Sequence, residues 1–230
     1  EIRLQETVSA IRVNKNHRVT GVSTDSKQHF GCDIIIANSD PSHLYQHMLP
    51  HHSVKKSAHR KRLRCEKSMG LFVLYFGTKK QYPDVAHHTI SLGPRYQALL
   101  EDIFHQKILT DDFSLYLHRP TATDPSFAPE GCDSFYALVP VPNLQGGQDW
   151  TTAGPILQQK VLENLNTTIL PGCIEALDHV FYKTPLDFKN EHLCPDGEGF
   201  SIAPTFSQSA WFRYHNQAEG PKNLYLVGAG

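Results

Sequence analysis

Two short strand-like runs near the ends of the chain constrain its fold more than any other feature. Residues 33–38 contain three consecutive isoleucines, and residues 224–230 form an apolar run that enters Gly-Ala-Gly. A continuous β-branched run is typical of a strand that is buried on both faces, as in a parallel sheet. The two ends therefore predict one discontinuous domain, in which residues 1–40 and 200–230 share a sheet and residues 41–195 form a second domain.

The remaining sequence alternates between strand and helix patterns. Residues 8–13 and 19–22 flank a polar turn cluster and predict a β-hairpin. Residues 68–77 are apolar at both alternating positions, so we expect a strand that is covered on both sides. Further strands are expected at 113–118, 135–141 and 180–182, and helical segments at 43–49, 54–67, 94–109, 154–170 and 184–190.

Charge and hydropathy exclude several classes of function. The formal net charge of −1 provides no overall field for nucleic acid. A basic run between Lys55 and Lys67 has no interleaved aromatic residues, which also argues against nucleic-acid binding. This run is either a solvated helix face or a contact for anionic lipid headgroups. No apolar run reaches the ~18–20 residues that a membrane-spanning helix needs.

The histidines and cysteines do not show the spacing of a metal site. His51-His52 and His87-His88 are adjacent pairs, whereas the ligands of a helical zinc site follow the pattern H-E-x-x-H. The five cysteines are far apart and contain no C-x-x-C pair. We therefore predict no metal site and no disulfide framework, and a reducing compartment.

Two local features could bind a ligand, and each has a structural alternative. Glycines that follow a strand, such as Gly228 and Gly230, let a backbone approach a phosphate or a flavin edge, but they also form ordinary turns. The strand aromatics of the middle segment either pack in a core or line an apolar cavity. These aromatics are Phe72, Tyr75, Phe76, Phe113, Tyr116, Phe135 and Tyr136.

A series of collinear motifs covers nearly the whole chain. They lie at residues 68–77, 86–89, 92–96, 112–121, 123–126, 128–132, 139–142, 208–213 and 223–230. Together these motifs resemble those of bacterial and fungal phytoene desaturases, which are FAD-dependent flavoproteins of the amine-oxidase-like superfamily. Each motif alone has modest specificity, whereas their joint occurrence in this order is highly specific.

This resemblance implies an α/β fold with an α+β substrate domain. Residues 1–44 and 196–230 would form part of a Rossmann-like FAD-binding domain of the amine-oxidase type, and residues 45–195 an inserted mixed-sheet substrate domain that covers the flavin. The family's N-terminal glycine motif would precede Glu1. The chain is therefore expected to be a C-terminal fragment that is inactive alone, because half of the cofactor site would be absent.

The resemblance also implies contacts with the cofactor FAD. The backbone near Val8 would contact the adenine, and the strand that ends at Asn38 would return to the FAD-domain sheet. Gly228, Ala229 and Gly230 would open the longer family motif that approaches the flavin.

The activity implied is the insertion of double bonds into a linear carotenoid precursor, from phytoene towards neurosporene or lycopene. The flavin would accept a hydride at N5, and the adjacent carbon would then lose a proton. His118, Arg119 and Asp124 are candidates for the polar end of the site, with structural hydrogen bonding as the alternative for each. Phe72, Tyr75, Tyr116 and Tyr136 would line the substrate passage.

A hydrocarbon substrate implies a membrane partner. Each buried CH₂ contributes ~0.8 kcal/mol, so a precursor of about forty carbons does not leave a bilayer for water. The resemblance therefore implies peripheral attachment to the cytoplasmic side of a membrane, with the basic run as one contributor.

Some positions depart from the family pattern. The loop at residues 193–197 lacks a usual Asn, aromatic residue and His, Ala203 replaces an acidic residue, and Tyr214 replaces a proline. These departures leave the number of desaturation steps open. The alternatives are another flavoprotein of the superfamily, such as a carotenoid isomerase or an amine-oxidase-like enzyme, or a non-catalytic module that binds apolar ligands.

Overall fold

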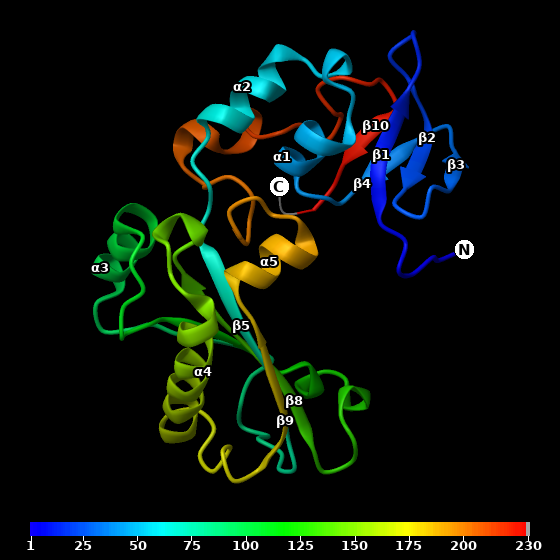
Figure 1. Cartoon of the computed structure of the whole chain (residues 1–230). Helices are drawn as coiled ribbons and strands as arrows, with labels where there is room; N and C mark the ends of the chain where they lie inside the picture. Colours follow the sequence, from blue (N-terminus) through cyan, green and yellow to red (C-terminus); the bar gives the residue numbers. More distant parts are fainter. Residues whose placement is uncertain (229–230) are drawn as a thin grey trace. The chain divides into compact units, whose positions relative to one another are not determined.

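The computed structural model describes residues 1–228, which form two compact units by their contacts (Figure 1). The first unit contains Glu1–Ser68, Asn190–Pro195 and the described residues from Phe200 onward, and the second contains Met69–Lys189 and Asp196–Gly199. Each unit has its own hydrophobic core. No helix within residues 1–228 is both long enough and apolar enough to cross a membrane.

The first unit begins with a small antiparallel sheet. It contains β1 (Val8–Val13), β2 (Val19–Thr24) and β3 (His29–Gly31), in that order. The predicted hairpin is confirmed, and its turn is held by Asn14, whose side-chain oxygen accepts a hydrogen bond from the backbone N–H of Asn16 at 3.0 Å. β3 was not predicted, because three residues carry too little pattern to detect.

The two ends of the chain meet in a second, parallel sheet. β4 (Ile35–Ala37) pairs with β10 (Leu224–Leu226), with Ile35 opposite Leu224. The prediction that the two ends share a sheet is confirmed for this pair. It is wrong for β1–β3, which form a separate sheet, so Val8 and Gly228 do not lie in the same sheet. The antiparallel strands close on one another through short turns, which leaves β4 as the partner of β10.

Asn223 connects the two sheets of the first unit. Its side-chain oxygen accepts a hydrogen bond from the backbone N–H of Val19 at 2.7 Å, and its amide donates to the carbonyl oxygens of Val19 and Asp33. Side chains from both sheets also enter one core, which includes Ile11 and Leu224.

The expectation that residues 33–38 are buried on both faces is wrong in this structure. Ile35 is half-buried and packs against the core, whereas Ile36 on the opposite face is 67% exposed. In a sheet of two strands, the side chains alternate between one core face and one open face.

Helical segments follow β4, and several of those between Pro41 and Arg64 contribute side chains to the core of the first unit. Asp40 caps the first of them, because its carboxylate accepts hydrogen bonds from the backbone N–H groups of Ser42 and His43 at 2.8 and 3.1 Å. The segments are α1 (Pro41–His43), a π-helical turn (Leu44–Met48), a 3₁₀ turn (His51–Ser53), α2 (Lys56–Arg64) and two later 3₁₀ turns (Phe206–Gln208 and Ala210–Phe212). The helical segments predicted at 43–49 and 54–67 are confirmed in shorter form.

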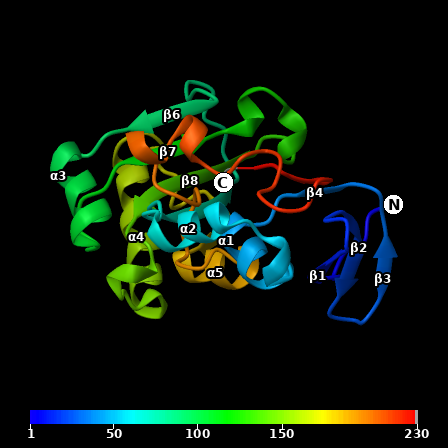
Figure 2. The same cartoon turned by 90° about the horizontal axis from the view of Figure 1, so that it is seen from above.

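The second unit is built on a five-stranded antiparallel sheet. Its strand order is β6-β7-β8-β5-β9, and Figure 2 shows β6, β7 and β8 as neighbours. The strands are β5 (Gly70–Thr78), β6 (His88–Ser91), β7 (Leu115–His118), β8 (Asp133–Val141) and β9 (Leu177–Lys183). Four of these were predicted; β6 was not, because its sequence His-Thr-Ile-Ser has little apolar alternation.

One face of this sheet is covered by α4 (Trp150–Thr167). The helix buries Leu157, Val161 and Leu165 against strand side chains such as Phe72 and Leu74. Asp149 caps the helix, as its carboxylate accepts a hydrogen bond from the backbone N–H of Thr151. The predicted helix at 154–170 is therefore confirmed.

Glycine allows one close approach in this interface. A Cβ at Gly154 of α4 would lie 2.8 Å from the ring of Tyr182 on β9. The absence of a side chain at this position lets the aromatic ring pack directly on the helix backbone. The other helical segments of the unit are α3 (Tyr96–Glu101), a π-helical turn (Asp102–Gln106), 3₁₀ turns (Pro120–Ala122, Pro125–Phe127 and Leu144–Gly146) and α5 (Pro185–His192).

Candidate functional site

The face of the sheet opposite α4 carries a continuous row of rings, one from each strand. Strand register places His88, His118, Tyr136, Tyr75 and Phe181 opposite one another, from β6 through to β9. Neighbouring rings are close enough to touch: the centroids of His118 and Tyr136 are 4.7 Å apart, and those of Tyr75 and Phe181 are 4.9 Å apart and stacked. We call these five residues the aromatic row.

The alternation of side chains along a strand sets which residues join this row. On β8, Tyr136 points to the open face while Phe135 and Ala137 are buried under α4. Tyr75 and Tyr136 are half-buried, and Phe181 is 55% exposed. The row is therefore an aromatic surface that is only partly covered.

Of the four aromatic residues predicted to line a substrate passage, three lie on this face. Tyr75 and Tyr136 belong to the row. Tyr116 lies on the same face, two residues before His118 on β7. Phe72 does not lie there: it is fully buried on the α4 side, where it stacks on Tyr182 with 5.2 Å between ring centroids. Phe72 is an odd number of residues from Tyr75, so the two point to opposite faces.

The hydroxyl groups of this face are hydrogen-bonded. The hydroxyl of Tyr116 lies 2.6 Å from Nδ1 of His88. Burial, followed by a hydrogen bond with Tyr136, raises the pKa of Tyr116 to about 12. Burial likewise raises the pKa of Tyr75. These phenols stay neutral at physiological pH and provide a surface without charge.

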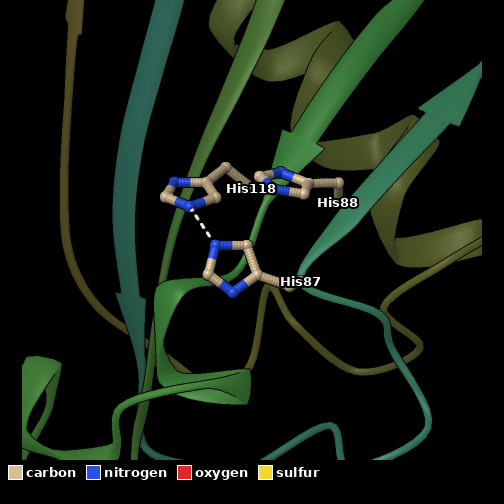
Figure 3. Close-up of side chains that lie close together, drawn as sticks. All are labelled: His87, His88 and His118. Atoms are coloured by element: carbon tan, nitrogen blue, oxygen red, sulfur yellow. Dashed lines mark hydrogen bonds between the residues drawn. The ribbon is translucent and has the colours of Figure 1, made fainter.

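His118 is the predicted polar residue that lies in the aromatic row. Its Nε2 is 2.7 Å from Nε2 of His87, so one of these two nitrogens must carry the proton of a hydrogen bond (Figure 3). Burial lowers the pKa of His118, and the neighbouring His87 and His88 lower it further. His118 is therefore neutral at physiological pH.

The other two predicted polar residues make structural contacts away from the row. Arg119 forms a buried ion pair with Asp133 at 3.0 Å and donates to the carbonyl oxygen of Val85 at 2.8 Å. Asp124 is exposed and caps a 3₁₀ turn through the backbone N–H of Ser126, whose hydrogen bonds lower the pKa of Asp124. Both side chains therefore make structural hydrogen bonds, and their role at the polar end of the site stays a prediction.

The first unit has a second candidate site, at the edge of the sheet where β4 and β10 end side by side. Asn38 follows β4, and Gly228 follows β10 with the positive φ of 109° that favours glycine. A Cβ at Gly228 would lie 2.1 Å from the side-chain oxygen of Asn38, so another residue does not fit here without movement. Ligands of open α/β sheets bind outside the carboxyl ends of parallel strands, which is the position of this edge.

Polar atoms without partners lie at the same edge. Oγ of Ser39 and Oδ2 of Asp40 are buried and have no hydrogen-bond partner among the described residues. Val8 is in the separate β1–β3 sheet, and Ala229 and Gly230 lie outside the described residues. The edge therefore offers a close backbone turn together with buried polar groups that a ligand could satisfy.

Comparison with known proteins gives a consistent relationship over the full chain. No family model matches it. The whole chain is 41% identical to the neurosporene-forming phytoene desaturase of Rhodobacter capsulatus and 39% identical to the lycopene-forming phytoene desaturase of Pantoea ananas. The chain is therefore similar over its full length to these phytoene desaturases. It spans 45% and 47% of these two proteins, which is about half the length of the curated relatives it matches.

Comparison with solved structures shows which known proteins share the fold of this chain. An oxidoreductase from Methanosarcina mazei matches 98% of the chain at 17% identity, with a TM-score of 0.58, and the chain covers 44% of it. Cyclohexylamine oxidase from Brevibacterium oxydans matches 96% at 10% identity, with a TM-score of 0.53, and the chain covers 42% of it. The predicted α/β fold of the amine-oxidase type is confirmed.

Sequence reasoning missed several residues of these sites. His87 and His88 were recognised as an adjacent pair and as part of the motif at 86–89, but not as neighbours of His118. Phe181 was expected in a strand but not on the aromatic face. Asp133, the partner of Arg119, was also missed. The register of β6 against β7 brings His88 next to His118, and residues so far apart in the sequence give no local sign of such a pairing.

Proposed function

We propose that this protein is an FAD-dependent oxidoreductase that introduces double bonds into a linear carotenoid precursor. The observation that carries the proposal is the match of the whole chain to proteins named as phytoene desaturases, at 39–45% identity. The neurosporene-forming and lycopene-forming relatives both match the chain, so the proposal covers phytoene as substrate and either compound as product.

The aromatic row has the chemistry that a hydrocarbon substrate requires. A linear polyene precursor has no polar group to bind, so recognition depends on apolar contact area and shape. Tyr75, Tyr136 and Phe181 provide adjoining rings, and Ile90 on β6 extends this face with an exposed side chain. We place the substrate against this face of the second unit.

The first unit fits an FAD at the edge formed by β4 and β10. The bare backbone at Gly228 and the buried, unpartnered oxygens of Ser39 and Asp40 are suited to a dinucleotide that approaches closely and donates hydroxyl hydrogen bonds. Asn38 could contribute its side-chain amide. When bound, FAD supplies the acceptor for the hydride that desaturation removes.

The side chains of the protein would then mainly position the substrate and exclude water. The aromatic row excludes water and orients the chain, and His118 is the retained candidate for the polar end of the site, because it is the predicted polar residue on that face. A cation that develops next to a double bond is allylic, which reduces the need for a strong protein base.

Expression of the intact protein in a phytoene-accumulating host tests this function. Neurosporene or lycopene pigment, with bound flavin in the purified protein, is the expected result. Bound flavin without a desaturated product would instead assign the protein to another activity of the same fold, such as carotenoid isomerisation or amine oxidation. A purified, folded protein without flavin would leave a non-catalytic module for apolar ligands.

Gly228 provides a matched test of the cofactor edge. Gly228→Ala adds both backbone strain and a clash with Asn38, and we expect loss of bound flavin. Gly131 has a positive φ of 77°, and no atom lies within 4 Å of the point that a Cβ would occupy there, so Gly131→Ala adds similar strain without the clash. Equal flavin content in the two variants would remove Gly228 from the cofactor site.

We further propose that the first unit attaches this protein to the cytoplasmic surface of a membrane. Two exposed aromatic side chains support this, Phe206 at 94% and Trp211 at 77% exposure. Hydrogen bonds between Gln208 and Glu66 hold this segment at the end of α2, whose exposed face carries Lys56, Arg60 and Arg64. Cations beside apolar rings suit an anionic leaflet.

The basic run contains side chains that make internal contacts as well as side chains that are exposed. Lys61 turns inward: it forms an ion pair with Glu219 at 2.8 Å and donates to the carbonyl oxygen of Arg213 at 2.5 Å. Lys67 is buried and donates to Oγ of Ser42 at 2.8 Å. Membrane contact is therefore assigned to the outward residues of α2 and not to the whole run.

Vesicle sedimentation tests the membrane proposal. Trp211→Ser combined with Phe206→Ser should reduce binding of the intact protein to vesicles that contain anionic lipid. Phe127→Ser is the matched control, because Phe127 is an exposed aromatic residue in the second unit. Unchanged binding of the double variant, or an equal loss in the control, would exclude this surface.

A further inference from the structure

Three histidine rings converge at the edge of the sheet in the second unit. His87 immediately precedes β6, His88 begins β6, and His118 ends β7. His88 and His118 are a cross-strand pair, and the carbonyl oxygen of His87 accepts a hydrogen bond from the backbone N–H of Arg119 at 2.9 Å. Backbone hydrogen bonds on both sides thus fix the positions from which the three rings project.

The rings are spaced as ligands of a single ion would be. Each can offer one nitrogen such that all three nitrogens lie within 4.8 Å of one another. Around a tetrahedral ion with metal–nitrogen bonds of ~2.0–2.1 Å, ligand nitrogens lie ~3.3 Å apart. The Nε2 atoms of His87 and His118 are 2.7 Å apart, so these two rings would move slightly apart to bind one ion (Figure 3).

The outer nitrogens of two rings already have the hydrogen bonds that orient metal ligands. Nδ1 of His87 is 2.5 Å from Oγ1 of Thr123, and Nδ1 of His88 is 2.6 Å from the hydroxyl of Tyr116. When Nδ1 carries the proton and donates it to such an oxygen, Nε2 keeps its lone pair for a ligand. The hydroxyls of Thr123 and Tyr116 are therefore placed to accept a proton from Nδ1 in the tautomers that coordination requires.

We propose that His87, His88 and His118 form a binding site for one divalent transition-metal ion such as Zn²⁺. Imidazole nitrogen is a preferred ligand of these ions, and three histidines with a fourth position left for water form a known type of open zinc site. His88 is exposed, so an ion can reach the site from solvent. The residues described elsewhere in the chain contain no second group of three possible ligands this close together.

Titration of the metal-free intact protein with Co²⁺ tests this site, because tetrahedral Co²⁺ has strong visible absorption bands that report the ligands directly. We expect these bands to saturate at one ion per chain and Zn²⁺ to displace the Co²⁺. His87→Gln and His118→Gln should each weaken binding at least ~10-fold, since losing a ligand costs more than losing a residue that orients one. Absence of the bands, or saturation far from one ion, would overturn the proposal.

Two controls separate this site from casual histidine binding. His43 and His47 form another close pair, with ring centroids 4.9 Å apart, so the double variant His43→Gln/His47→Gln should leave the Co²⁺ spectrum unchanged. His179→Gln removes an exposed histidine of the second unit and should also have no effect. If the bands disappear in either control and persist in the His87 and His118 variants, the assignment is wrong.

Thermal unfolding gives a second readout that does not depend on desaturation. A ligand that binds only the folded state raises Tm, so excess Zn²⁺ should raise the Tm of the wild type by several degrees but not that of His88→Gln. His88 is exposed and its substitution should not disturb folding, which keeps the test valid if His118→Gln is unstable. Equal shifts in both proteins would contradict the site.

Discussion

The two faces of the five-stranded sheet are made by the same strands and have opposite character. The face under α4, here the covered face, is buried on its central strands by residues such as Phe72, Leu74 and Ala137. The other face carries the half-exposed aromatic row with its hydroxyl and imidazole groups. At the aromatic row, one residue of a strand therefore packs in the core and the next lies on the open face. A substitution's effect should then depend on which of these two places the side chain occupies.

The largest expected effect is at the end of the covered face, where Arg119 neutralises Asp133. Arg119→Leu leaves the Asp133 carboxylate buried beside only Tyr82 N–H and the Thr121 hydroxyl. Removing one partner of a buried pair typically destabilises a protein by ~3–5 kcal/mol. Urea unfolding at neutral pH measures this loss.

The double variant Arg119→Leu/Asp133→Asn is the control for that prediction. With both charges removed, much of the lost stability should return, because no uncompensated ion remains buried. A double variant as unstable as Arg119→Leu would show that packing, and not charge, is lost at this position.

A pair of neighbouring residues tests the comparison of faces directly. Leu74 is fully buried on the covered face, and Leu74→Ala should cost ~2–5 kcal/mol through lost transfer energy and a cavity. Tyr75 is next in sequence but lies in the aromatic row, and Tyr75→Ala should cost about 1 kcal/mol, the size of its aromatic contacts. Equal losses in urea unfolding would break the distinction between the two faces.

Much of this division could be predicted from local sequence. The continuous apolar run at 68–77 identified β5, the strand pattern at 135–141 identified β8, and the helical period at 154–170 identified α4. Because side chains alternate between the two faces of a strand, the sequence also places Phe72 and Tyr75 on opposite faces. The two residues therefore could not both line one substrate passage.

Long-range register accounts for what sequence could not supply. The pairing of His88 with His118 depends on the alignment of β6 with β7, and β6 has too little apolar pattern to be recognised. The separation of β1–β3 from β4 and β10 likewise depends on which edges pair, which no single segment encodes. Ion pairs such as Arg119–Asp133 follow only after the register is known.

The open face should tolerate loss of a hydroxyl but not gain of a charge. Tyr136→Phe keeps the ring and should change stability by no more than about 1 kcal/mol, since it removes one partner of Tyr116. Under the proposed function, phytoene turnover in vesicles should stay within about twofold, because hydrocarbon makes no use of a hydroxyl.

Tyr136→Glu is the contrasting variant. A carboxylate in the aromatic row must be desolvated when a hydrocarbon lies on it, and turnover should fall more than about tenfold while the protein stays folded. Full activity of Tyr136→Glu would mean that substrate does not bind to this face.

The smallest expected effect concerns the charge that caps α4, and it depends on pH. Hydrogen bonds from Thr151 and then Thr152 lower the pKa of Asp149 in the folded protein. Its carboxylate therefore contributes stability that is present above the ordinary aspartate pKa of ~3.9 and is lost as pH falls through the lower, folded-state pKa. Asp149→Asn retains a capping oxygen without this charge, so its Tm should lie slightly below that of wild type at pH 6, with the difference shrinking below pH ~4.

A variant of Asp124 is the control that tests whether the effect is specific to α4, the helix that covers the sheet. Its pKa is also lowered by hydrogen bonds, but it caps only a surface turn of three residues. Local opening of such a turn need not unfold the unit, so Asp124→Asn should leave global Tm unchanged at both pH values. If Asp124→Asn shifted Tm with the same pH dependence as Asp149→Asn, the effect would reflect general surface charge, and the stability of the covered face would not depend on the cap of α4.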